Sequence, residues 1–139
     1  MATKENEAKK DFLRRYEVLL RREKEIEQEI EAIRSKYTGK AITYSDMPKA
    51  TEQHDLSDYV AEAGLLFSTL DEIRCDLMRQ YRAISDRIEA MNTDDEREKE
   101  LLRLKYLRCL DWEDVADAMT YHIRWVYELH GRALAHFKM

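Results

Sequence analysis

The side chains best suited to chemistry in this sequence are its histidines and cysteines, and their spacing favours neither a metal site nor catalysis. His122, His130 and His136 are not at consecutive i, i+4 positions with a carboxylate to complete a ligand set. Cys75 and Cys109 lie far apart and lack a CxxC pattern, so we expect two reduced thiols in helices. Paired catalytic carboxylates, a nucleophile beside its base and a Gly-rich phosphate loop are also missing from the sequence. We therefore expect no enzyme, no metal and no cofactor.

The order of apolar and polar residues in the last third of the chain is more informative. Leu110 precedes a short predicted helix, and the tight connection Thr120-Tyr121 separates that helix from the last one. The residues expected to face a core are Trp112, Val115, Ala116 and Met119 in the short helix, and Val126, Leu129, Ala133 and Leu134 in the last. A short bracing helix, a turn of a few residues and a second, exposed helix form a helix-turn-helix. In that motif the second helix enters the major groove of DNA.

Two segments of this region are similar to a known family. Residues 101–106, Leu-Leu-Arg-Leu-Lys-Tyr, and 112–116, Trp-Glu-Asp-Val-Ala, resemble region 4 of sigma-70 factors, and Val126, Leu129 and Phe137 continue the match. The variant His-Gly-Arg-Ala-Leu at 130–134 is more typical of the RinA/ArpU-like transcriptional regulators of bacteriophages and prophages. That group also has a long helical N-terminal half and a loop similar to Ser-Asp-Met-Pro at 45–48. The resemblance implies control of phage genes, often late genes, through promoter DNA and host RNA polymerase.

The resemblance also implies which side chains touch DNA. On the groove-facing side of the last helix it places Ile123, Arg124, Tyr127 and Glu128. Arg124 is the candidate for a bidentate contact to guanine, and Glu128 could accept a hydrogen bond from cytosine. Tyr127 or Ile123 could pack on a thymine methyl. Arg132 and Lys138 are expected at phosphates, which position a protein without specifying sequence.

Some positions depart from the family pattern or suit another role. Thr120 stands where the family often has Gly or Asn, so a residue that disfavours left-handed backbone must make the turn. His122 replaces the usual Ser or Thr cap. Only Arg124 brings a firm positive charge to the groove-facing side, so we expect weak DNA affinity or a dimer. Trp125 is equally suited to contacting another protein.

Two long heptad-patterned segments precede this region. The first is expected at 8–37, with the seam Phe12, Tyr16, Leu19, Ile26, Ile30, Ile33 and Tyr37. The second is expected at 55–91, with the seam Leu56, Val60, Ala63, Phe67, Leu70, Leu77, Tyr81, Ile84, Ile88 and Met91. Glu23 and Arg74 are the polar breaks in the two seams. Thr38-Gly39 is expected to end the first helix, a loop to occupy about 38–55, and Asp55 to cap the second helix. We predict an antiparallel hairpin, closed within one chain or between the chains of a homodimer.

The predicted boundary between the hairpin (1–92) and the C-terminal domain (93–139) follows the break at Asn92-Thr93. Thr93 and Glu96 have the spacing of a capping box, which predicts a helix from there to about 108. Asp111 is expected to cap the next helix, at 111–119, and a last helix is expected at 122–137.

Composition fits an all-α protein. The 139 residues include only 3 Gly and 1 Pro, and 38% are charged, which is typical of long helices. No stretch approaches the ~20 apolar residues that a membrane-spanning helix needs, and the first residues do not resemble a signal peptide. We therefore expect a location in the cytoplasm of a bacterial host. The net charge of −5 argues against indiscriminate DNA binding, although from His122 onward Arg124, Arg132 and Lys138 outnumber the single acid Glu128.

Three hypotheses remain open. The first is a phage-type regulator that binds promoter DNA, with two copies on half-sites about one helical turn or a multiple apart. The second is a protein-interaction module that keeps the helix-turn-helix but acts on RNA polymerase or another host or phage protein. The third is a DNA-packaging recognition subunit, although those proteins usually place the DNA-binding part first. A ring-sized oligomer would favour the third hypothesis.

Overall fold

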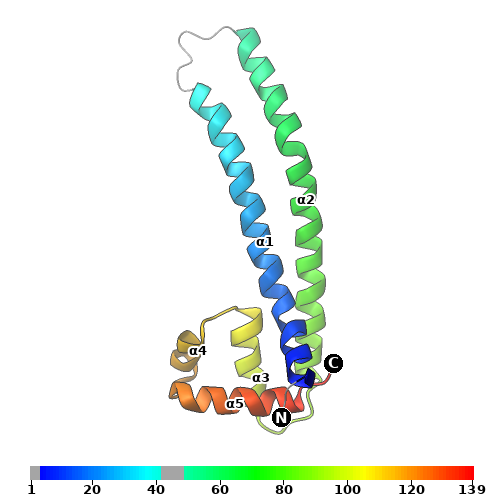
Figure 1. The fold of residues 1–139 in the computed structure, drawn as a ribbon, viewed down its shortest axis with the longest axis vertical. Helices are drawn as coiled ribbons and strands as arrows, with labels where there is room; N and C mark the ends of the chain where they lie inside the picture. The colour runs from blue at the N-terminus through cyan, green and yellow to red at the C-terminus, as the bar shows by residue number, and fades with distance from the viewer. Residues whose placement is uncertain (1–3, 42–48) are drawn as a thin grey trace. The chain divides into compact units, whose positions relative to one another are not determined.

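The chain forms helices throughout the part that can be described. The computed structural model describes residues 4–41 and 49–139, with side chains at 4–37 and 56–139. Within these ranges there is no strand, which confirms the all-α class. The elements are α1 (Lys4–Ala41), α2 (Lys49–Glu89), α3 (Glu96–Leu102), the π-helical turn η2 (Arg103–Leu107), α4 (Trp112–Met119) and α5 (Ile123–His136) (Figure 1). None of the described helices is long and apolar enough to cross a bilayer.

The helices divide into two compact units, and the first contains 20–41 of α1 and 49–76 of α2. Arg74 donates to Glu23 and to Glu27, both at 3.0 Å, and Tyr37 donates to Glu62 at 2.6 Å. Residues early in the α1 segment therefore face residues late in the α2 segment, which confirms the antiparallel pairing. The two polar breaks in the predicted seams, Glu23 and Arg74, are ion-pair partners.

The ends of the long helices differ from the prediction. The α1 backbone stays helical through Thr38 and Gly39 to Ala41, and α2 already begins at Lys49. Asp55 therefore lies within α2 and does not cap it. A single Gly inside a helix costs only about 1 kcal/mol relative to Ala, so Gly39 is a weak stop signal. The Ser-Asp-Met-Pro segment at 45–48 lies outside the described residues.

The second unit combines 4–19 of α1 and the end of α2 from 77 with all the later helices. Its fully buried side chains are Leu13, Ile84, Ile88, Leu101, Leu102, Val115, Val126, Leu129, Ala133 and Phe137. Both long helices thus contribute to one core with α3, α4 and α5, whereas the sequence suggested a division at 92 and 93. The first turns of α1 are structural parts of the C-terminal helical body.

The start of α3 is capped differently from the prediction. Asp95 is the N-cap and accepts from the Arg97 N–H at 3.0 Å, while Thr93 Oγ1 accepts from the Asp95 N–H at 3.1 Å. The Arg97 guanidinium also donates to both Asp95 carboxylate oxygens at 2.9 Å and lowers the pKa of Asp95. The predicted box of Thr93 and Glu96 is therefore wrong, because a charge-assisted pair fixes the cap two residues later.

After α3 the helix continues as predicted but widens into the π-helical turn η2. Arg108 N–H donates to Arg103 carbonyl at 2.9 Å, an i to i+5 hydrogen bond. Leu104, Tyr106 and Leu107 are all buried here. A π turn inserts an extra residue into a helix and so re-aims the side chains beside it, and such turns are frequent at functional sites.

Candidate nucleic-acid interface

The connection between α4 and α5 is a tight turn made by a left-handed residue. Thr120 has φ 58° and ψ 40°, and the Tyr121 N–H donates to the Ala116 carbonyl at 3.0 Å. This confirms that the turn uses a residue whose Cβ disfavours the left-handed region. His122 then begins α5 as its N-cap, since its Nδ1 accepts from the Arg124 N–H at 3.1 Å. An imidazole nitrogen thus replaces the hydroxyl that usually caps a helix at this position.

The apolar face predicted for α5 is buried. Val126, Leu129 and Ala133 are fully buried and Leu134 nearly so. Ala116 of α4 is buried as well, which lets the two helices approach closely. These residues fix the orientation of α5 in its unit, and the polar residues between them lie on the solvent side, except for the buried His130.

The predicted DNA-contacting residues are exposed, with one exception. Arg124, Tyr127, Glu128, Arg132 and Lys138 are exposed, whereas Ile123 is partly buried against the core. Among the described residues, neither Arg124 nor Glu128 has a side-chain hydrogen-bond or ion-pair partner. Both are therefore available to an external ligand.

Arg132 and Lys138 are placed differently from those two. The Arg132 guanidinium lies 5.2 Å from the centre of the Trp125 ring, and Trp125 is 38% exposed. Lys138 lies beyond the end of α5 at His136. Their predicted phosphate contacts remain predictions, and Trp125 with Arg132 forms a cation–π pair on the surface.

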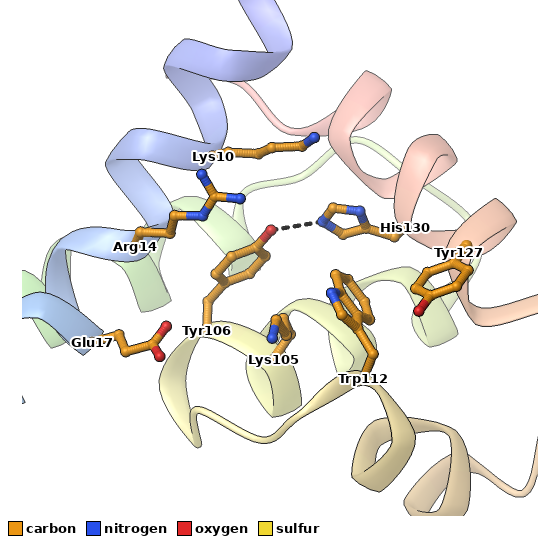
Figure 2. A pocket seen from close by; sticks show the side chains of 8 residues that line it. All are labelled: Lys10, Arg14, Glu17, Lys105, Tyr106, Trp112, Tyr127 and His130. Carbon is orange, nitrogen blue, oxygen red and sulfur yellow. Dashed lines mark hydrogen bonds between the residues drawn. The ribbon is translucent and has the colours of Figure 1, made fainter. Parts of the chain in front are cut away.

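A pocket that the sequence did not reveal lies beside α5 (Figure 2). It has a volume of about 300 Å³. Its charged lining consists of Lys10, Arg14 and Glu17 from α1 and Lys105 from η2. Its rings are Tyr106 of η2, Trp112 of α4, and Tyr127 and His130 of α5. Tyr127 therefore belongs both to the exposed face of α5 and to this pocket.

The floor of the pocket is a buried polar pair surrounded by cations. Tyr106 Oη and His130 Nε2 lie 2.7 Å apart and share a hydrogen bond. Burial, together with the smaller effect of the charges on Lys10, Lys105 and Arg14, lowers the pKa of His130 to about 4. Burial also raises the pKa of Tyr106 to about 12. Both rings are therefore neutral near pH 7, and the positive charge of the pocket comes from its lysine and arginine side chains.

The α1 wall of the pocket is held in place by two contacts to the end of α5. Lys9 is buried, and its Nζ donates to the Leu134 carbonyl at 2.7 Å. The rings of Phe12 and Phe137 lie 6.1 Å apart. The Leu134 carbonyl also accepts a longer hydrogen bond from the Phe137 N–H at 3.3 Å, so Lys9 adds a stronger donor and a positive charge at the C-terminus of α5. The one sequence signal for this packing is Leu13, an apolar residue next to Phe12 but outside the heptad seam.

A buried carboxylate of α3 also contacts the end of α5. Glu98 of α3 is buried, and its Oε1 lies 2.6 Å from His136 Nδ1 at the end of α5. His136 therefore has a structural partner. Among the described residues, no three His, Cys, Asp or Glu side chains are grouped as metal ligands.

Comparisons with known proteins leave the function to be argued from these contacts. No protein-family model matches the chain, and no curated protein or solved structure matches it significantly. The resemblance to sigma-70 region 4 and to the phage regulators accordingly remains a prediction from residues 101–137.

Proposed function

We propose that this chain is a phage or prophage transcriptional regulator, and not an enzyme, acting in the cytoplasm of a bacterial host. It binds promoter DNA through α4 and α5, which form a sigma-region-4-like helix-turn-helix, and it activates late genes together with RNA polymerase. In this role α4 braces the motif and α5 enters the major groove.

The observation that carries the proposal is the start of α5 on its left-handed turn. Thr120 and the His122 cap end one helix and begin the next within a few residues. Arg124 and Glu128 then lie one helical turn apart on the solvent side, without partners among the described side chains. An arginine and a glutamate in this position can distinguish guanine from cytosine through the hydrogen-bonding groups on the major-groove edges of the bases.

Sequence selection with purified protein tests the proposal. We expect a random duplex library to yield one enriched motif, and Arg124→Ala to cost about 1–3 kcal/mol of binding free energy and relax one base pair of that motif. Arg82→Ala is the matched control, since Arg82 is an exposed arginine of α2, outside the α4–α5 motif. An equal loss on every sequence would instead place Arg124 at a phosphate. Absence of any enriched motif would contradict DNA reading.

A homodimer is part of the proposal, because half of the α2 seam is uncovered in the first unit. Ala63 and Leu70 are buried, but the alternating seam residues Val60 and Phe67 are 59% and 41% exposed. A second copy of the same seam is the occupant that fits, since identical heptads match in register. Two copies would also compensate for the small number of cations on each α5.

The oligomeric state tests this part. We expect wild-type protein to sediment as a dimer and Phe67→Glu to sediment as a monomer, because a buried, unpaired carboxylate is costly. Leu65→Glu is the control, as Leu65 is 79% exposed and lies off the seam. A wild-type monomer at the concentrations that bind DNA would contradict the dimer.

The exposed Trp125 supports a second candidate function, binding to RNA polymerase or another host or phage protein. Tryptophan and arginine dominate the binding energy of many protein interfaces, and Trp125 and Arg132 form one exposed pair. Trp125→Ala should then abolish co-purification with polymerase while leaving the DNA affinity unchanged. The reverse pattern, with DNA binding lost and polymerase binding kept, would exclude this surface as the partner site.

A further inference from the structure

We propose that the pocket between the start of α1, η2 and α5 binds a phosphate group. The phosphate belongs either to the DNA backbone or to a free phosphorylated compound, and both present the same tetrahedral oxyanion. The DNA source rests on the proposed function, whereas the free compound does not. No sequence motif indicated this site, because its cations come from segments about ninety residues apart.

The charge of the lining favours an anion. Lys10, Arg14 and Lys105 bring three positive charges, and Glu17 brings one negative charge, which leaves an excess of two. Figure 2 shows Lys10 and Arg14 extending from α1 towards the ring pair Tyr106–His130. Because a cleft with partly buried walls strengthens electrostatic attraction, an anion gains more here than on an open surface.

The cations also retain unused hydrogen-bond donors. Arg14 has no side-chain hydrogen-bond or ion-pair partner among the described residues. Lys10 Nζ lies 3.5 Å from Glu7 in an exposed pair, which is a weak contact. Lys105 Nζ donates to the Leu110 carbonyl at 3.2 Å, and an ammonium has three donors. A guanidinium fork and two ammonium groups match the oxygen atoms of a phosphate.

The pocket is built before any ligand arrives. Lys9 and Phe12 fix α1 against the end of α5 through a 2.7 Å hydrogen bond and a 6.1 Å ring contact. Trp112 packs edge-on against His130, with ring centres 4.6 Å apart. A preorganised site loses less conformational entropy on binding than a mobile one.

The position beside α5 explains how the site would serve DNA binding. Tyr127 lines the pocket and is also 50% exposed on the face of α5 that carries Arg124. A phosphate in the pocket would therefore lie next to the groove that α5 reads. Such a contact adds affinity for DNA without adding sequence preference. This added affinity would compensate for the small number of cations on α5.

The test uses the full-length chain with Trp125→Phe, so that Trp112 is the only tryptophan. One arm adds inorganic phosphate at constant ionic strength and follows Trp112 emission and the NMR titration of His130. The other arm measures the affinity for duplex DNA across a salt series. The double variant Lys10→Gln/Arg14→Gln is compared with Arg82→Gln, which removes one charge from α2 outside the pocket. The substituted residues are not fully buried, so both variants are expected to fold.

Either arm can support the proposal. Saturable binding of inorganic phosphate that raises the His130 pKa, and is at least tenfold weaker in the double variant, identifies a free phosphorylated compound. A slope of log affinity against log salt that is smaller by about 2 in the double variant, with no response to free phosphate, identifies the DNA backbone.

The remaining outcomes separate this proposal from the proposed function. DNA binding with an unchanged salt slope, together with no phosphate response, overturns the pocket proposal and leaves the regulator intact. A phosphate response in a protein that binds no DNA supports the pocket and overturns the regulator. No response in either arm overturns both.

Discussion

The neutral histidine at the floor of the pocket makes the stability of the fold depend on pH. His130 is 8% exposed, hydrogen-bonded to Tyr106 and surrounded by Lys10, Arg14 and Lys105. Its pKa is lowered to about 4, whereas a histidine in an unfolded chain titrates near about 6.5. At a pH between these two pKa values, His130 is mostly protonated in the unfolded chain and mostly neutral in the folded chain. Stability is therefore full above about pH 6.5 and falls as the pH decreases towards 4.

The size of this effect follows from the two pKa values. At pH 5 an unfolded histidine is almost fully protonated and folded His130 is about one-tenth protonated, so linkage removes about 2 kcal/mol of unfolding free energy relative to pH 7. Asp95, whose pKa is lowered by Arg97, also makes stability fall as the pH falls, because the unfolded chain again binds the proton more readily than the folded chain. Its contribution is present above the unfolded pKa of about 3.8 and is lost only at lower pH, outside this window.

Urea unfolding at pH 7 and pH 5, followed by circular dichroism, measures the effect. The matched variant is His130→Gln, because an amide can still share a hydrogen bond with the Tyr106 hydroxyl but does not titrate. We expect the loss of stability between pH 7 and 5 to be about 2 kcal/mol smaller in the variant than in the wild type. An equal loss in both proteins, or an NMR titration of folded His130 near pH 6.5, would contradict a lowered pKa of His130 in the folded chain.

Three further predictions concern the helix ends, and urea unfolding checks each of them. Lys9→Met should cost about 1 kcal/mol, because the Leu134 carbonyl loses its shorter hydrogen bond and keeps only the one from the Phe137 N–H at 3.3 Å; a neutral effect would show that water replaces the lysine. Thr120→Gly should be more stable than Thr120→Ala by about 1 kcal/mol, since Gly adopts a left-handed turn without strain; equal stabilities would contradict a strained turn. His122→Ala should cost about 1 kcal/mol and His122→Ser much less, and equal losses would show that the cap at Arg124 contributes nothing.

Periodicity alone predicted much of the fold. Apolar residues at helical spacing identified the buried face of α5, and Val126, Leu129 and Ala133 are fully buried. Glu23 and Arg74 are the polar residues that interrupt the two heptad seams, and in the structure Arg74 Nε donates to Glu23 Oε2 at 3.0 Å. These features depend on neighbours within a helix or on one repeated contact between helices, so a single sequence contains them.

Contacts between distant segments could not be predicted in the same way. Lys9 looks like any lysine of a charged helix, yet it is buried and binds the Leu134 carbonyl, because the first turns of α1 pack against α5. Lys10, Arg14 and Lys105 form a pocket for the same reason. The N-cap of α3 was also predicted at the wrong residue. Asp95 caps the helix because the Arg97 guanidinium pairs with its carboxylate, and the spacing of residue types does not show that ion pair.

The most direct test of promoter-DNA binding is the equilibrium affinity of the purified protein for duplex DNA, measured across a salt series with promoter fragments and shuffled competitors. We expect a complex that prefers one sequence and whose log affinity falls linearly with log salt, because phosphate contacts release counterions. Folded protein that forms no complex even at low salt would contradict promoter-DNA binding and leave Trp125 and a protein partner as the better explanation of α5.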